Sequence, residues 1–392
     1  MSCGATPFVD SPDHERSRCR GRQLSPATLL GYYVCETGDD GLTDVPFLRN
    51  SERHDFKRCI LRWHWRYNEH LVLPNVTTGP LVFGTLGHLA LAEWYIPGKT
   101  RGVEPQETWA KLTKELWDTV NLGPVTDEVE AEWTDARQLG DAMLGNYRRH
   151  YGTDDHWEVL WVEDQFHQRI PHPADLQAGV HPPRPIVEYV GTIDLIVRNH
   201  ETGQIEYVDH KFMKTIETDH LYIDDQNGGY LAIGTHELRK RGLIGEKEAI
   251  RALVYNFLRK ALPPDRPQNA MGQYLNQDGT VSKRQPPAFF HRERIERTGA
   301  ERNRQIQRIG EEALHHNAVR SGALPIIKNP TKDCRWDCSF FDLCSIHESG
   351  GDLAFAKKTL YKKENPYSEY ETGAESPKVL GHKGGDERNL AE

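Results

Sequence analysis

Hydrophobic residues in the first part of the chain follow a helical spacing. They recur at intervals of three or four positions, which places them on one face of an amphipathic helix. The stretches with this pattern are residues 51–67, 84–95, 104–120 and 127–151. In the first of them we expect a single helix whose buried face carries Phe56, Cys59, Ile60, Trp63 and Tyr67.

The pattern changes after residue 156 to short runs of β-branched and aromatic residues, which are typical of strands. These runs cover residues 157–170, 187–199 and 204–213, and NHETGQ between the last two predicts a hairpin turn. A helix is expected at 224–241, a strand at 252–262 and, after a loop rich in Pro and Gln, a charged helix at 292–321. This order predicts an α/β fold with a mixed central β-sheet flanked by helices.

Both ends of the chain are polar. Residues 1–50 are rich in Gly, Asp, Arg, Ser and Pro without periodic hydrophobic positions, so we expect a polar N-terminal extension. Residues 351–392 predict a flexible polar C-terminal tail, which leaves 51–350 for the ordered domain. No run approaches the roughly 18 apolar residues of a membrane helix, and the N-terminus lacks the apolar core of a signal peptide. We therefore expect a cytoplasmic protein without membrane association.

Two carboxylates and a lysine occupy unusual positions in the predicted hairpin. Asp194 lies in its first strand, and Asp209 and Lys211 lie two residues apart in the second, so these two face the same side. A buried carboxylate needs a partner, and a hard divalent cation supplies one. A cation that activates water beside a charge-stabilising ammonium group suits phosphodiester hydrolysis. The alternative is that these residues are turn-flanking acids and an exposed strand lysine.

The segments GTID, ending at Asp194, and VDHK, containing Asp209 and Lys211, resemble the PD-(D/E)XK nuclease superfamily and, within it, the RecB-like nuclease domains. The resemblance implies a restriction-endonuclease-like core, Mg²⁺ or Mn²⁺ as the catalytic metal, and Asp194 and Asp209 as ligands. It assigns a catalytic role to Lys211. DNA is the substrate that this family implies.

Further residues match the family in the expected order. His88, in FGTLGHLALAEWY, resembles the upstream histidine of the metal site, and Glu163 resembles the acid on the strand before the first carboxylate. Gln226 and Tyr230 resemble a Gln-x-x-x-Tyr motif that contacts the DNA backbone or supports the catalytic lysine. His88 has an alternative as an ordinary helix histidine. The competing acids on the strand of Glu163 are Glu158 and Asp164.

The chain has seven cysteines, and in a cytoplasmic protein they are expected to be thiols or metal ligands rather than disulfides. Cys334, Cys338 and Cys344 crowd together as C-x3-C-x5-C, and a metal centre built on them needs a fourth ligand, for which Cys59 is the natural donor. Such a centre would tie distant parts of the chain together. Cys3, Cys19 and Cys35 are scattered in the N-terminal region without an assigned role.

This set resembles the iron-sulfur RecB-like exonucleases, which include the AddB-type nuclease domains and the CRISPR-associated RecB-like exonucleases. There, one upstream cysteine and three cysteines near the C-terminus hold a [4Fe-4S] cluster. The present sequence has C-x3-C where C-x2-C is common. A structural Zn²⁺ ion bound by the same four thiols is the alternative, because ligand types alone do not separate the two centres. Four unrelated thiols are a further alternative.

The formal net charge of -9 argues against a protein that grips nucleic acid through its global field. Local basic runs at 239–241 and 292–308 either contact phosphates or form solvated helix faces. The sequence has no Walker A motif, so we expect no helicase motor in this chain. It would then be a stand-alone nuclease or one subunit of a larger enzyme. Possible partners are a second copy or a recombination or helicase protein.

The sequence thus predicts a metal-dependent DNA exonuclease for single-stranded DNA or DNA ends, in recombination, repair or DNA processing. A trimming nuclease of CRISPR adaptation is an alternative in the same class. In another class, the chain would be a non-catalytic iron-sulfur module that binds nucleic acid. A zinc hydrolase built on His88 lacks the H-E-x-x-H spacing that would support it.

Overall fold

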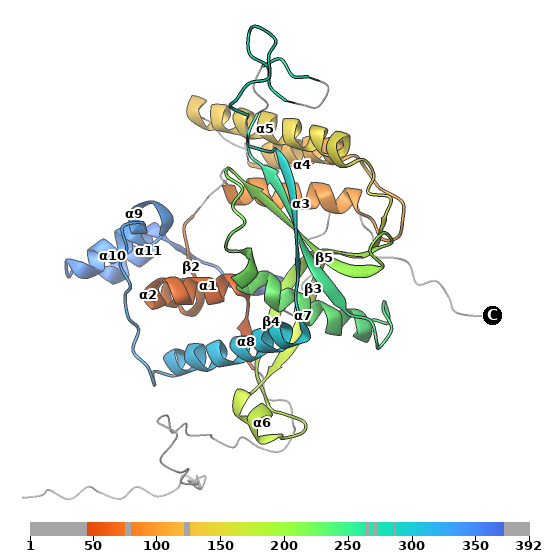
Figure 1. Cartoon of the computed structure of the whole chain (residues 1–392). Helices are drawn as coiled ribbons and strands as arrows, with labels where there is room; N and C mark the ends of the chain where they lie inside the picture. Colours follow the sequence, from red (N-terminus) through yellow and green to blue (C-terminus); the bar gives the residue numbers. More distant parts are fainter. Residues whose placement is uncertain are drawn as a thin grey trace, which may run out of the picture. The chain divides into compact units, whose positions relative to one another are not determined.

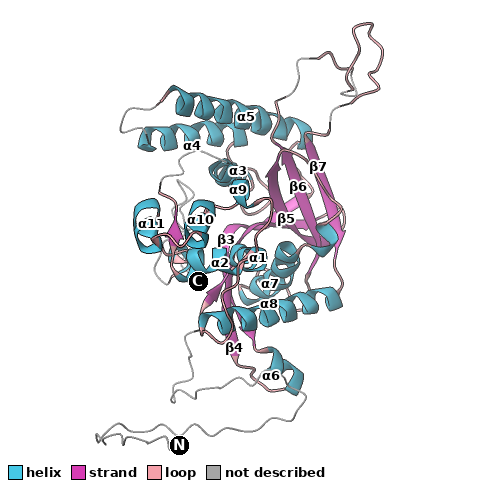
Figure 2. Ribbon diagram, turned by 90° about the vertical axis from the view of Figure 1, so that its left-hand side faces the viewer, coloured by secondary structure: helices cyan, strands magenta, loops and turns pink. Residues whose placement is uncertain are grey.

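A six-stranded mixed β-sheet lies at the centre of the molecule (Figures 1 and 2). The computed structural model describes residues 45–371 except 75–79, 121–125, 263–265, 270–272 and 286. The sheet order is β1-β4-β5-β6-β7, and β3 pairs with the other edge of β4. These strands are β1 (Phe47–Leu48), β3 (Trp157–Pro171), β4 (Pro185–Asn199), β5 (Gln204–Met213), β6 (Ile250–Arg259) and β7 (Phe290–Glu296).

Pairing is parallel between β1 and β4 and between β5 and β6, and it is antiparallel elsewhere in the sheet. The β4–β5 pair is the predicted hairpin, with its turn at 200–203. The parallel β5–β6 pair needs a crossover, which α7 (Asp225–Lys240) supplies. This arrangement confirms the predicted α/β fold with a mixed sheet.

Helices cover both faces of the sheet (Figure 1). One face packs against α3 (Pro80–Trp94), α4 (Pro105–Val120) and α5 (Asp127–Tyr151), and the other against α7 and α8 (Gly299–Arg320). Strand β4 is buried on both sides because neighbouring side chains point in opposite directions. Leu195 and Val197 join the first core, and Ile196 joins the second. Each such side chain contributes about 1.5–3 kcal/mol to stability when it is fully buried.

The predicted helix at 292–321 is wrong in its first part. Residues 290–296 form strand β7, and α8 begins only at Gly299, after a capping box made by Thr298 and Glu301. The sequence FHRERIE is too charged to be recognised as a strand by hydrophobic alternation. Charged side chains suit it because β7 is an edge strand, and β6 is its one pairing partner among the described residues.

The single helix predicted for 51–67 is interrupted. Helix α1 (Asn50–Arg58) ends at Cys59, whose backbone is extended (φ -169°, ψ 117°), and α2 (Ile60–Trp63) continues into a π-helical turn (His64–Asn68). The hydrophobic spacing continues across the break, so the spacing alone could not reveal it. The break changes the direction in which Cys59 points.

The C-terminal segment differs from the flexible tail expected for 351–392. After α9 (Cys334–Asp337) and α10 (Phe341–Glu348), the chain forms α11 (Leu353–Leu360), then β8 (Lys362–Lys363), which pairs with β2 (Leu71–Val72), and a 3-10 turn (Ser368–Tyr370). Tyr367 and Tyr370 are buried against Trp63 and Tyr67, and the Tyr367 hydroxyl donates to Glu52. A few buried tyrosines therefore hold a segment of polar composition in place.

Short helical elements connect the larger ones. They include helix α6 (Pro173–Ala178) and the 3-10 turn Leu221–Ile223. Residues 1–44 and 372–392, which hold most of the predicted extension and the end of the predicted tail, lie outside the described residues. Within the part that the structure describes, none of the helices has the length and apolar character needed to cross a membrane.

Candidate metal and catalytic site

Three carboxylates lie side by side on neighbouring strands. Glu163 on β3 is opposite Asp194 on β4, because the residue pairs on either side of them are in register. The last pair of the β4–β5 ladder is Leu195 with Val208, and Asp194 and Asp209 are the next residues beyond it on the two strands. These two strands therefore stop pairing at the point where their carboxylates occur.

His88 reaches this row from α3. Its Nδ1 atom lies 3.2 Å from Glu163 Oε1 and 3.2 Å from Asp194 Oδ2. One ligand atom from each of the three residues lies within 4.8 Å of the others, a spacing that a single metal ion can bridge. The structure thus brings together three of the four residues predicted as metal ligands.

Electrostatics of this trio favour a cation. Burial lowers the pKa of His88, but Asp194 and Glu163 outweigh it and raise the pKa well above the usual value. Burial raises the pKa of Asp194, yet His88, His210 and Lys211 together hold it at about 2. The imidazolium therefore carries positive charge between two carboxylates. A divalent cation bound by the same nitrogen and oxygens would replace that proton.

Glu163 has a strained backbone conformation. Its φ is 38°, a left-handed value that costs a non-glycine residue about 1–3 kcal/mol and that often occurs at functional sites. The two competing acids face other partners: Glu158 pairs with His200 at 3.0 Å, and Asp164 pairs with Arg241 at 2.5 Å. Of the three acids considered on this strand, Glu163 is the one that contacts His88.

Asp209 and Lys211 form a pair next to the trio. Asp209 is 2% exposed, and its Oδ1 accepts from Lys211 Nζ at 3.0 Å and from the Tyr207 hydroxyl at 3.2 Å. Lys211 Nζ also lies 2.8 Å from Oδ2, but at an angle that leaves Oδ2 without a hydrogen bond among the described residues. Burial raises the pKa of Asp209, and Lys211 limits it to about 6. The buried Oδ2 is a lone-pair donor suited to a metal ion.

Asp209 does not join the group of mutually close ligand atoms formed by His88, Glu163 and Asp194. The sequence predicts all four as ligands of one metal site, so the position of Asp209 outside this group differs from that prediction. Tyr207 was not predicted at all, although it lies two residues before Asp209 and so faces the same side of β5.

His210, the middle residue of the D-x-K segment, also contributes to the site. Its backbone N–H donates to Asp194 Oδ2 at 2.8 Å, a bond made possible by the end of the β4–β5 ladder. Its ring points away from Lys211, stacks on Tyr95 and lies 2.9 Å from Asn256 Nδ2. Burial lowers the pKa of His210 to about 3, so the ring is neutral and Nδ1 accepts from the amide. No sequence motif marked this role.

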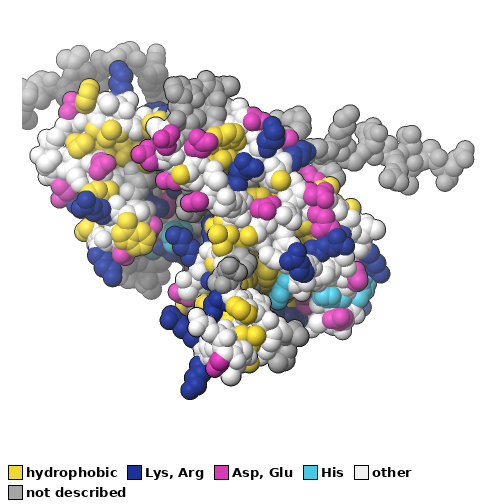
Figure 3. Space-filling model, turned by 90° about the horizontal axis from the view of Figure 1, so that it is seen from above, with side chains coloured by type: hydrophobic (Ala, Val, Ile, Leu, Met, Phe, Trp, Pro, Cys, Tyr) yellow, Lys and Arg dark blue, Asp and Glu magenta, His cyan; other side chains and the backbone are white. Residues whose placement is uncertain are grey.

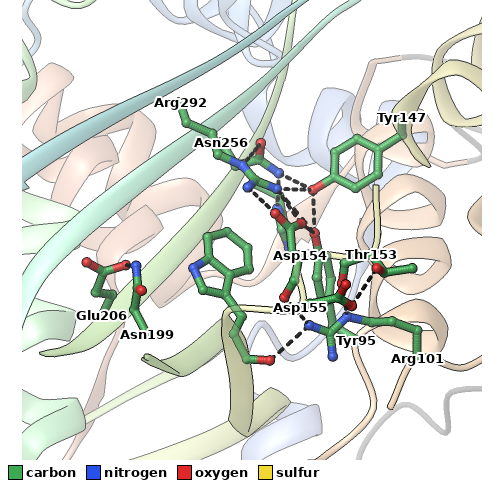
Figure 4. A network of polar contacts seen from close by, with 12 residues as sticks. Tyr95, Arg101, Tyr147, Thr153, Asp154, Asp155, Asn199, Glu206, Asn256 and Arg292 are labelled. Carbon is green, nitrogen blue, oxygen red and sulfur yellow. Dashed lines mark hydrogen bonds and ion pairs between the residues drawn. The ribbon is translucent and has the colours of Figure 1, made fainter. Parts of the chain in front are cut away.

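A buried polar network centred on Arg292 (Figure 4) is connected to His210 through Asn256. The Arg292 guanidinium donates to Asp154 at 2.6 and 2.8 Å and to the hydroxyls of Tyr147 and Tyr95 at 3.2 and 3.3 Å. Asn256 connects this network to His210, because its Nδ2 also lies 2.8 Å from the Tyr147 hydroxyl. The network ties β6 and β7 to Tyr147 of α5 and to Tyr95, the residue that follows α3.

We expect Arg292→Ala to lower the free energy of unfolding by about 3–5 kcal/mol, because it leaves Asp154, whose side chain is 2% exposed, as an unpaired buried charge. Denaturant unfolding followed by circular dichroism measures the change. Arg304→Ala, an exposed residue of α8, is the matched control and is expected to stay within about 0.5 kcal/mol of the unchanged protein. Equal stability of the two variants would show that the network contributes little.

Other arginines of the two basic runs also bind within the molecule. Arg239 donates to the Glu248 carbonyl at 2.6 Å and Arg241 pairs with Asp164. In the second run, Arg294, Arg302 and Arg308 contact Glu206, the Ile250 carbonyl and Asp225. These contacts give the side chains a structural role.

Tyr230 and Gln226 lie on α7, as the sequence predicted. Tyr230 is buried against Phe166, and a Cβ atom added at Gly191 would come within 2.6 Å of the Tyr230 hydroxyl. Glycine in GTID is therefore needed for the close approach of this tyrosine to β4. Gln226 is half-buried in the first turn of α7 and makes no side-chain hydrogen bond with the described residues. Among the described residues, neither side chain forms a hydrogen bond or ion pair with Lys211, whose partner is Asp209.

Comparison with known proteins gives the family. The family model described as the PD-(D/E)XK nuclease superfamily matches residues 51–345, which is more than half of the chain. The chain belongs to the PD-(D/E)XK nuclease superfamily. A crystal structure of a "putative exonuclease" from Eubacterium rectale is similar with a TM-score of 0.39 and 10% identity, over 74% of this chain and 88% of that one. None of the curated proteins matches this chain.

This nuclease-superfamily chain also brings its four predicted cluster cysteines together. Cys59, Cys334, Cys338 and Cys344 line one pocket of about 230 Å³, and all four are free thiols. The extended backbone at Cys59 places its Sγ 3.4 Å from the Asn329 backbone N–H. The break between α1 and α2 therefore has a local consequence: Cys59 faces the C-terminal cysteines.

The cysteine pocket is also suited to negative charge. Cys334 Sγ accepts from the Thr331 backbone N–H at 3.3 Å and from Arg58 at 3.7 Å. The backbone N–H donor of Thr331 is the main cause of the lowered pKa of Cys334. Burial raises the pKa of Cys338 and Cys344. A metal centre that binds thiolates would keep these two deprotonated.

Proposed function

We propose that this protein is a metal-dependent DNA exonuclease that hydrolyses phosphodiester bonds of single-stranded DNA or DNA ends. The observation that carries the proposal is the convergence of His88, Glu163 and Asp194 beside the Asp209–Lys211 pair, in a chain of the nuclease superfamily. DNA as the substrate, the exonuclease mode and a role in recombination, repair or DNA processing belong to the proposal.

His88, Glu163 and Asp194 would hold one Mg²⁺ or Mn²⁺ ion, with Asp209 Oδ2 close by as a further oxygen ligand. The ion would supply charge neutralisation at the phosphate and a lower pKa for the attacking water. Oxygen donors suit both metals, and one imidazole is acceptable among them. The strained backbone of Glu163 and the His210 N–H bond to Asp194 hold two carboxylates in position.

Lys211 is the side chain with a direct catalytic role in this proposal. Its ammonium group is half-buried, and Asp209 fixes it at 3.0 Å. From there it can orient the attacking water or donate to a phosphate oxygen on which negative charge develops. A preorganised donor of this kind contributes about two to three powers of ten to the rate.

The test is a cleavage assay on end-labelled linear DNA, single-stranded and double-stranded, with Mg²⁺, Mn²⁺ or EDTA. We expect cleavage with either metal and none with EDTA, and a roughly hundredfold slower reaction of Lys211→Ala. Lys240→Ala, on the surface of α7, is the control and should match the unchanged protein. Circular single-stranded DNA should survive, because an exonuclease needs an end.

Several outcomes contradict the proposal. Undiminished cleavage by Lys211→Ala would remove Lys211 from the mechanism, and cleavage of circles would make the enzyme an endonuclease. DNA binding without cleavage under every metal condition would favour the non-catalytic module instead. Labels at the 5′ and 3′ ends separate the two polarities in the same assay.

We further propose that the cysteine pocket holds a [4Fe-4S] cluster, as in the iron-sulfur RecB-like exonucleases. No three Sγ atoms of these four cysteines, all of them described, lie within 4.8 Å of one another. Thiolates around a single Zn²⁺ ion would be closer, roughly 3.8 Å apart for a tetrahedron with Zn–S of about 2.3 Å. A wider set around a pocket of about 230 Å³ fits a cluster better than a single zinc ion.

A further inference from the structure

A groove lined by aromatic side chains begins next to the candidate catalytic site. It has a volume of about 460 Å³ and lies between α3, α4, α5 and the ends of β5 and β6. This size is within the roughly 300–1,000 Å³ of ligand pockets. The apolar lining of this aromatic groove includes Phe83, Leu86, Trp109, Trp133, Ala136 and Phe212.

Two glycines make room for the aromatic walls. A Cβ atom at Gly87 would lie 2.5 Å from the ring of Phe212, and one at Gly140 would overlap the ring of Trp109. Phe212 therefore rests directly on α3 and Trp109 directly on α5. The groove is a built feature of the packing between these helices and the sheet, since both walls depend on residues without side chains.

One wall of the groove lies beside His88 of the candidate site. Phe212 follows Lys211 in β5 and points to the opposite face of the strand, toward α3, where its ring centroid is 5.4 Å from that of His88. The ring centroid of Phe83 is 4.8 Å from that of Trp109 and 6.2 Å from that of Phe212. A strand whose phosphate sits at the metal site would therefore place a neighbouring nucleotide in the aromatic groove.

Positive charge lies along the groove. Lys214 and Lys260 line it, and Lys260 Nζ is 4.7 Å from the centre of the Phe83 ring. Burial lowers the pKa of Lys260, and the charge of Lys214 lowers it further. The two ammonium groups are thus near each other, and a phosphate bound between them would meet positive charge from both. Arg137 adds a third cation, against one acid, Glu132.

We propose that the aromatic groove binds a nucleotide of an unpaired DNA strand, with its base against the aromatic side chains and its phosphate near Lys214 and Lys260. Stacking on aromatic side chains is open to every base, whereas bases within a duplex already stack on each other. The groove would therefore make the nuclease select single strands. This inference rests on the proposed function, because it places the groove beside the cleaved phosphate.

General attraction to DNA is a weaker explanation for binding. On the face of the molecule seen from above, acidic and basic side chains are interspersed with hydrophobic ones (Figure 3). The net charge of the whole chain is -9. Binding that depends on the field of the whole protein would be opposed by this charge, so a local site with both stacking and cationic groups is needed.

The test measures DNA binding separately from cleavage, with Asp209→Asn as the background that prevents degradation. The probes are a fluorescein-labelled oligothymidylate and a labelled blunt duplex of equal length, followed by anisotropy. Ala136→Glu introduces a carboxylate into the groove, and Lys214→Glu reverses a charge there. We expect each to weaken binding of the single strand roughly tenfold, with little effect on the duplex.

Each variant has a control. Gln138→Glu adds the same charge to an exposed position of α5, and Lys247→Glu reverses an exposed lysine before the start of β6, whereas the groove lies at the end of that strand. Both controls should bind the single strand as the background does. Circular dichroism of all four variants excludes unfolding as the cause of any loss.

The outcomes separate the groove from the proposed function. Metal-dependent cleavage by the unchanged protein, together with unaltered single-strand affinity of both groove variants, would overturn the groove and leave the nuclease intact. Equal loss for single strand and duplex would overturn the selectivity. If DNA affinity is unchanged but the protein is a dimer that the Ala136→Glu substitution dissociates, the groove binds a second copy of the chain instead of DNA. Absence of cleavage by the unchanged protein would instead contradict the proposed function.

Discussion

Asp194→Asn is expected to lower the rate of DNA cleavage by roughly a thousandfold while the protein stays folded. The amide has the shape of the carboxylate, and its oxygen can still accept from the His210 N–H, which lies 2.8 Å from Oδ2. It loses the negative charge that would hold the metal between His88 and Glu163. A metal ion stabilises the transition state by several kcal/mol, and each 1.36 kcal/mol is a factor of ten in rate.

The measurement is the cleavage rate at increasing Mn²⁺ concentration, together with binding of Mn²⁺ by calorimetry. Asp164→Asn is the matched control. Asp164 lies on β3, one residue after Glu163, and its side chain pairs with Arg241 rather than with His88. The control should cleave DNA at the unchanged rate. An Asp194→Asn protein that keeps a tenth or more of the activity at every Mn²⁺ concentration would show that this carboxylate is not a metal ligand.

Cys59→Ala is expected to remove the cluster and to destabilise the protein severely. Binding free energy at a structural metal centre contributes to folding, about 10 kcal/mol or more at zinc sites. A typical domain is stable by about 5–15 kcal/mol in total. Cys59 comes from the junction of α1 and α2, whereas the other three thiols come from α9, α10 and the turn between them. Without the centre these two regions lose a bond that joins them.

Iron content, sulfide content and visible absorption of protein purified without oxygen measure the loss, and thermal unfolding measures the stability. Cys35→Ala is the control, since it removes a cysteine that is not assigned to the cluster. It should keep the colour and the unfolding temperature of the unchanged protein. A colourless protein with one zinc ion per chain would replace the cluster with the zinc alternative.

The sequence was informative where a local pattern sets the geometry. Alternation along β5 requires Asp209 and Lys211 to face the same side, and the structure joins them at 3.0 Å. Local hydrophobic patterns were enough to predict four elements: the apolar runs predicted β4 and β5, and the helical spacing predicted α4 and α5. The roles of His88 and Cys59 required a resemblance to a family, because no local spacing connects them with their partners.

The rest depended on contacts between distant parts of the chain. Arg292 was expected on a helix, but pairing with β6 makes its segment a strand and places the guanidinium on Asp154. His210 acts through its backbone N–H, which the type of side chain does not reveal. Tyr367 and Tyr370 hold a polar segment by burial against aromatic residues 300 or more positions earlier. Patterns of composition cannot show such partners.

Contacts between the beginning and the end of the described chain have a consequence for synthesis. Every residue of the candidate catalytic site, from His88 to Tyr230, has been translated long before the segment that pairs with the first helices. The Glu52 carboxylate accepts a hydrogen bond from the Tyr367 hydroxyl, and Leu71 of β2 pairs with Lys363 of β8. A chain still growing on the ribosome therefore already carries all the candidate catalytic side chains while α1 and β2 lack these partners. Release of the last residues then completes the packing around α1 and β2.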